Sequence, residues 1–250
     1  MDLFHTLVAA HIVTGAIGLV AFWVPVLVRK GGGLHVKVGR VFTLSMLATG
    51  TIACGIALTT LAWPLETHPK LDDPALVRGI FGWMMLYLAL LTINLAWHGW
   101  LAAANKRDVA ANREWRNLLL QPVVFAAALN CLVQGLLIAQ PLMIAISFVG
   151  FATVATNVWF LWKPAFVVGG HTPFDWQLEH IKSLVGAGIS VYTAFLAFGA
   201  VRLMPEAALS PALWSVPLVT GVTIIIVQQQ KVRRRFRRAA PASAGAPATA

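Results

Sequence analysis

Histidine is the residue type in this chain whose placement could support chemistry. Seven histidines occur among 250 residues, and a neutral imidazole can ligate a metal ion or haem iron, or carry a proton. Polar groups at membrane depth are costly, so they usually have a partner or a task. Because His11, His35, His98 and His180 lie inside or beside long apolar segments, we predict that they are the cofactor-binding candidates.

The depth of two of these histidines limits how they could act together. At a rise of about 1.5 Å per residue, His11 is expected roughly 6 Å below the outer membrane boundary and His98 roughly 5 Å above the inner one, about 20 Å apart. One metal ion cannot reach both. A haem held by two imidazoles needs ligands at matching depth on different helices, and the inner group offers His98 with His35 or His180.

A metal site of a second kind would use a carboxylate as well. The predicted ligand set for a transition-metal ion, such as zinc or copper, is His35, His171, His180 and Glu179, with Asp175 as the alternative carboxylate. Both cysteines lie inside apolar segments, and the sequence has no dense metal-binding or haem-attachment motif. The alternative for His171, near the membrane surface, is hydrogen bonding without any ligand.

Seven long apolar runs must hold these histidines. Each run approaches the ~20 residues that a helix needs to cross the hydrocarbon core, and none has the alternation of barrel strands. A spanning segment has to satisfy its own backbone hydrogen bonds, which leaves the α-helix. We therefore predict an all-α, polytopic transmembrane helical bundle with about seven spans at residues 7–28, 41–63, 80–101, 122–140, 142–162, 183–203 and 212–228.

Positive charge indicates the orientation of the bundle. Short loops rich in Lys and Arg stay on the cytoplasmic side, and most cations of this chain fall in alternate gaps between the runs or after the last one. Lys70, Arg78 and Arg202 lie in the other gaps, where carboxylates outnumber them. The sequence thus predicts an outside N-terminus, an inside C-terminus and a bacterial-type inner (plasma) membrane. The predicted inside cations are Arg29, Lys30, Lys37, Arg40, Lys106, Arg107, Arg113, Arg116, Lys163, Lys182, Lys231, Arg233, Arg234, Arg235, Arg237 and Arg238.

Composition separates this chain from soluble proteins. Hydrophobic residues make up 58% of it and charged residues 11%, so the net charge of +10 is interpreted as a topology signal, with the lipid bilayer and not nucleic acid as the partner. The first run lacks a basic leading region and is too long for a cleaved signal peptide. We expect residues 1–238 to form a single transmembrane helical domain, and residues 239–250, all Ala, Pro, Ser, Gly and Thr, to be disordered.

Polar side chains recur at helical spacing on several runs. Tyr87, Asn94 and His98 follow one another at seven and four residues, so they share one helix face. Thr153 and Asn157 are also four residues apart. We predict that these stripes face the bundle interior, because polar groups are rarely exposed to lipid.

Three short motifs are similar to those of one protein family. They are His11-x3-Gly15, the stretch Leu34-His35-Val36-Lys37-Val38-Gly39-Arg40, and Trp176-x3-His180-x5-Gly186 running into Tyr192-Thr193-Ala194-Phe195. Together they resemble a bacterial family of multi-pass predicted membrane proteins of unknown function. The resemblance implies His11, His35 and His180 as site residues, with Arg40 and Trp176 in support. It names no reaction.

Three classes of function fit these observations. The leading hypothesis is a redox-type membrane protein with a histidine-ligated haem b or transition-metal ion, and with quinone or a membrane partner protein as its electron partner. The first alternative is a path for a proton, metal ion or small solute, with His11 and His98 as gates. The second is a membrane assembly or interaction protein whose helices mostly pack. No nucleophile elbow or metalloprotease motif occurs in the sequence. The sequence therefore assigns no enzymatic reaction to the chain.

Overall fold

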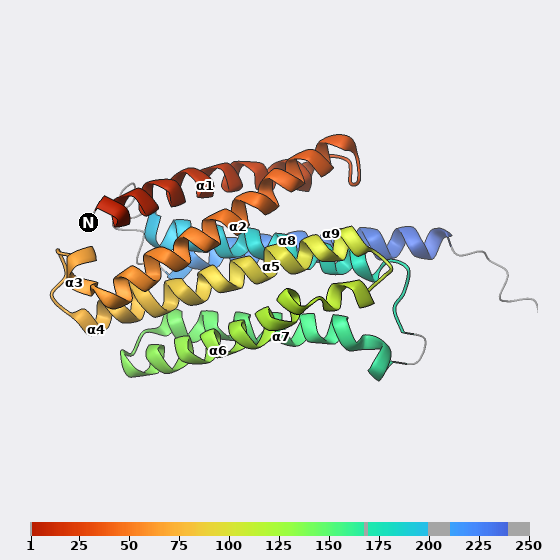
Figure 1. Ribbon diagram of the computed structural model, residues 1–250. Helices are drawn as coiled ribbons and strands as arrows, with labels where there is room; N and C mark the ends of the chain where they lie inside the picture. The colour runs from red at the N-terminus through yellow and green to blue at the C-terminus, as the bar shows by residue number, and fades with distance from the viewer. Residues whose placement is uncertain (1, 168–169, 200–210, 240–250) are drawn as a thin grey trace, which may run out of the picture.

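The computed structural model describes residues 2–167, 170–199 and 211–239, and over these ranges the chain is helical and contains no strand. The long helices run side by side in an elongated bundle (Figure 1). They are α1 Asp2–Leu27, α2 Gly33–Ala62, α5 Met85–Asn105, α6 Trp115–Leu137, α7 Pro141–Phe166, α8 Asp175–Ala194 and α9 Pro211–Ala239. The shorter elements are α3 Pro64–Thr67, α4 Pro74–Val77, η1 Arg78–Met84, η2 Ala110–Arg113 and η3 Phe195–Gly199. The predicted all-α fold is confirmed.

Within residues 2–167, 170–199 and 211–239, five helical stretches are long and apolar enough to cross a membrane. They coincide with the first five predicted runs and cover Leu3–Leu27, Gly33–Ala62, Pro74–Asn105, Trp115–Leu137 and Pro141–Lys163. The sixth and seventh predicted runs fall on α8 and α9, which are not among these five. The count of seven spans therefore stays a prediction. Part of the sixth run, 200–203, lies outside the described ranges.

Several helices extend beyond the apolar runs that predicted them, among them α2, α8 and α9. α2 begins at Gly33 and α8 at Asp175, both well before the predicted runs. α9 continues to Ala239, so the basic segment after its apolar part is helical. Once a helix has formed, each further residue adds a backbone hydrogen bond, so polar residues can prolong it. As a result, His35 and His180 lie on helices. The predicted disordered tail falls outside the described residues except for Ala239.

α5 lies at the centre of the core, where it packs against α2, α6 and α8. Tyr87, Asn94 and His98 on this helix are 0% exposed, which confirms that the predicted stripe faces inward. Thr153 and Asn157 of α7 are also buried. The buried polar side chains of α5 therefore meet those of its neighbours inside the bundle.

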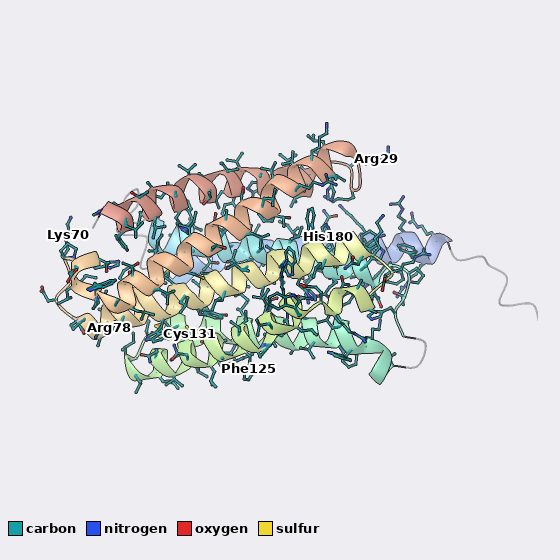
Figure 2. The ribbon with its side chains drawn as sticks, in the orientation of Figure 1. Arg29, Lys70, Arg78, Phe125, Cys131 and His180 are labelled. Carbon is teal, nitrogen blue, oxygen red and sulfur yellow. The ribbon has the colours of Figure 1, made fainter. Side chains whose placement is uncertain are left out.

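The two ends of the bundle carry different groups of cations. Figure 2 places Arg29 at one end and Lys70 and Arg78 at the other, as the predicted topology requires. The C-terminal part of α9, which holds residues 231–238, extends at the same end as Arg29 (Figure 1). We call this end, which holds Arg29 and residues 231–238 of α9, the basic end. Which membrane side it faces stays a prediction.

Candidate histidine site

Two of the predicted ligands, His35 and His180, come together in the structure. His35 lies in the first turn of α2 and His180 near the start of α8. Their ring centroids are 6.3 Å apart and the ring planes are inclined by 62°. His180 is in the half of the bundle nearer the basic end (Figure 2). The predicted haem ligands were His98 with either His35 or His180, whereas the two rings that the structure brings together are those of His35 and His180.

Each of the two rings is held through Nδ1 by a backbone carbonyl. The Nδ1 atom of His180 lies 2.9 Å from the Gly99 oxygen, and that of His35 lies 3.2 Å from the Pro25 oxygen. A carbonyl oxygen only accepts, so Nδ1 carries the proton in both rings. A neutral ring then has its lone pair on Nε2, and neither Nε2 has a hydrogen-bond partner among the described residues. Metal-ligating histidines are commonly held in this way.

The end of α1 explains why the Pro25 oxygen is available. α1 ends at Leu27, so the carbonyls of its last turn have no N–H partner within the helix. The Lys30 ammonium donates to the Pro25 oxygen at 2.7 Å, and His35 shares this acceptor. His35 therefore has a structural role as well, because it helps to cap the end of α1.

A close approach of α5 and α8 supplies the acceptor for His180. A Cβ atom added to Gly99 would lie 2.9 Å from the Cβ of Ser183 and 2.8 Å from a methyl group of Leu184. These distances leave no room for a side chain at position 99. Glycine therefore lets the two helices approach closely where His180 donates to the Gly99 oxygen.

His98 is bound through both ring nitrogens, in contrast to His35 and His180. Its Nε2 lies 2.9 Å from the Glu179 carboxylate, and its Nδ1 lies 3.1 Å from Oδ1 of Asn117. The Asn117 amide is oriented by its own donation to the Asn112 carbonyl at 2.7 Å, which turns its oxygen toward the ring. A ring protonated at both nitrogens would donate to both acceptors. His98 thus has no free nitrogen for a metal ion.

The contacts of Glu179 define a buried charged cluster, which consists of His98, Glu179 and Lys182. His98 is 0% exposed and Glu179 8%. Glu179 forms an ion pair with Lys182, whose ammonium also donates to Thr156 at 3.0 Å and to Asn157 at 2.9 Å. Lys182, which was predicted to flank the gap before the sixth apolar run, lies inside α8 because this helix begins before that run. The ion pair could have been predicted from the sequence, because side chains three residues apart on a helix are neighbours.

His11 lies apart from the pair. Its Nδ1 is 3.3 Å from the Thr49 carbonyl, in the contact between α1 and α2. Thr49 also donates to Thr14 at 2.9 Å. These bonds join two helices and bring no second histidine to His11.

His171 lies in the connection before α8, beside Asp175. Its Nδ1 is 3.4 Å from the Asp175 carboxylate. Burial lowers the pKa of His171, although the nearby Asp175 charge acts to raise it. Burial raises the pKa of Asp175, but hydrogen bonds from Lys163 and Thr172 outweigh burial, so this pKa lies below its ordinary value. His171 is therefore engaged with a carboxylate that already has other donors.

The predicted four-residue metal set is not assembled as a group. In the part of the chain that the structure describes, no three of His, Cys, Asp and Glu lie where they could hold one metal ion. His171 is beside Asp175, and Glu179 is bound by His98 and Lys182. Of the set His35, His171, His180 and Glu179, the structure thus brings together the rings of His35 and His180.

Comparisons with known proteins give no further assignment. No protein-family model, curated protein or solved structure matches the chain. The resemblance to a bacterial membrane-protein family therefore stays a prediction, and the description of the site rests on its own geometry.

Proposed function

We propose that this chain is a redox-type membrane protein that holds haem b or one transition-metal ion between His35 and His180. The supporting observation is the pair of rings, each fixed through Nδ1, with no partner for Nε2 among the described residues. Two imidazoles that held one metal ion, each at about 2 Å from metal to nitrogen, would have ring centroids up to about 6 Å apart. The separation of 6.3 Å fits this arrangement.

The bound group would supply one-electron transfer, and quinone or a membrane partner protein is the proposed electron partner. The chain itself orients the ligands. Hydrogen bonds from Nδ1 to the Gly99 and Pro25 oxygens fix both rings and increase the basicity of Nε2. Glu179, next to His180 in the sequence, belongs to the buried charged cluster, in which His98 of α5 binds it. Rotation of α8 would break these contacts, so the cluster positions His180 through its helix.

The test uses asparagine substitutions that separate ligation from helix capping. In His35→Asn and His180→Asn the amide nitrogen can replace Nδ1 as the donor to the backbone carbonyl, but nothing replaces Nε2. We expect about one iron or copper per wild-type chain purified in mild detergent without added metal, and loss of it in both variants. One zinc per chain would exclude electron transfer at the site, because Zn²⁺ has no redox chemistry. Elemental analysis measures the metal, and an absorption spectrum identifies haem.

The matched control is His11→Asn, because His11 also lies near a backbone carbonyl through Nδ1 and is apart from the pair. This variant is expected to keep the metal. Wild-type protein without metal would overturn the proposal. The same metal content in His35→Asn and His180→Asn as in the wild type would also overturn it and would leave His35 as a helix cap.

A second candidate function, transport of a proton or small ion, is favoured by the buried charged cluster. Amide side chains continue from this cluster: Asn157 donates to Asn94 and Gln121, both at 3.2 Å. Ionisable groups inside a membrane bundle often mark ion pathways. Ion flux into liposomes that is abolished by His98→Ala would support this function, and equal flux in both proteins would exclude His98 as its gate.

A further inference from the structure

A hollow of about 440 Å³ lies at the basic end, between three parts of the chain. Its walls come from the end of α5 and the residues after it, from the start of α8, and from α9. The lining side chains used below are Asn105, Lys106, Arg107, Asp108, Trp176 and Phe236. A smaller hollow of about 140 Å³ shares Lys106, Arg107 and Trp176 and extends the space to His171.

The charges around this hollow are not balanced. Asp108 accepts a hydrogen bond from the Ala111 N–H at 3.2 Å, and Asp175 is held by Lys163 and Thr172. In contrast, Lys106 and Arg107 are exposed and form no ion pair within the described ranges. The two cations thus outnumber Asp108, the carboxylate that lines this hollow and accepts a backbone N–H, whereas Asp175 already has a cation partner in Lys163.

The backbone places Lys106 in an unusual conformation. Its φ of 52° and ψ of −108° form the C-cap of α5. A positive φ is unfavourable for a residue with a side chain, and such residues are enriched at ligand-binding sites. The Asn105 side chain stabilises the turn, because it donates to Asn112 at 2.8 Å. The turn brings Lys106 and Arg107 to the same hollow.

From these observations we infer that the hollow binds the phosphate group of an anionic phospholipid headgroup. Lys106 and Arg107 supply the counter-charge, while Trp176 and Phe236 supply apolar walls next to the acyl chains. Basic pockets between helices at the cytoplasmic membrane surface suit such headgroups. The basic segment of α9 on either side of Phe236 adds to the positive potential. This inference does not depend on the histidine pair.

The experiment measures lipid binding to the full chain by native mass spectrometry in detergent. Phosphatidylglycerol, phosphatidylcholine and inorganic phosphate are compared for the wild type and for the double variant Lys106→Gln/Arg107→Gln. At about 1 kcal/mol per cation near the surface, loss of two cations is expected to weaken phosphatidylglycerol binding about thirtyfold. Phosphatidylcholine binding should change little.

The matched control is Lys37→Gln/Arg40→Gln, which removes two exposed cations that do not line the hollow. We expect it to bind phosphatidylglycerol as the wild type does. A charge-preserving variant, Lys106→Arg/Arg107→Lys, should also retain binding and guards against a general folding defect. Equal losses in the hollow variant and the control would overturn the proposal. If inorganic phosphate bound through the same two residues as tightly as phosphatidylglycerol does, the inference that the ligand is a lipid headgroup would be overturned.

Discussion

Glu179→Gln is expected to lower the free energy of unfolding by about 3 kcal/mol, because removal of one partner from a buried ion pair costs about 3–5 kcal/mol. Glu179 is 8% exposed and His98 0%, so the substitution leaves the Lys182 ammonium without its counter-ion and Nε2 of His98 without its carboxylate partner. We expect the lower end of the range. The Lys182 side chain is 21% exposed and keeps Thr156 and Asn157 as acceptors.

A double substitution tests whether the loss comes from coupled charges. Lys182→Met alone leaves the Glu179 carboxylate with His98 as its remaining partner in the cluster. In Glu179→Gln/Lys182→Met both opposite charges are gone, and no uncompensated Lys182 or Glu179 charge is left. The decrease in the free energy of unfolding of the double variant is therefore expected to be smaller than the sum of the two single decreases, by about 1 kcal/mol or more.

The assay is unfolding of the purified protein in mixed detergent micelles, followed by far-UV circular dichroism and tryptophan fluorescence. Glu66→Gln makes the same chemical change at an exposed position and should stay within about 0.5 kcal/mol of the wild type. If Glu179→Gln were as stable as this control, or if the two single losses added without coupling, the reasoning about the buried charged cluster would be refuted.

Two further predictions concern packing and acid stability. Gly188→Ala is expected to cost about 1–3 kcal/mol in denaturant unfolding, since its Cβ would lie 2.3 Å from the buried Phe22 ring, whereas Gly33→Ala, with nothing within 4 Å, should cost nothing. Burial raises the pKa of Glu114, but hydrogen bonds from Trp97 and from the first N–H groups of α6 outweigh burial, so this pKa lies below its ordinary value. Glu114 therefore stabilises the fold above its unfolded pKa, and this contribution disappears as pH falls below about 4.3 through the folded pKa. Glu114→Gln should flatten the acid side of the stability curve, and an unchanged slope would contradict this.

The inward stripe of α5 shows what helical periodicity can predict. Tyr87, Asn94 and His98 share a face by their spacing alone, and all three are buried. Their partners could not be predicted in the same way. The partner of His98 is Glu179, 81 residues away, and this contact depends on how far α8 is shifted along α5.

The bounds of the helices were less predictable than their existence. Hydropathy marks where the chain is apolar, but helix formation continues wherever backbone hydrogen bonds can propagate. α8 accordingly begins at Asp175, well before the apolar run. Lys182 flanks the gap between two apolar runs, as predicted from hydropathy, and it also lies within α8, where it pairs with Glu179.

The sequence by itself determined that this chain forms apolar helices and which of their faces are polar, because both follow from residue types and a fixed helical period. It also identified histidine as the residue for a candidate site. Only the tertiary structure decided that His35 meets His180 and that His98 is bound on both sides. The physical reason is that these contacts require close approach of separate helices, as at Gly99 against Ser183, and their relative positions depend on side-chain packing across the whole core.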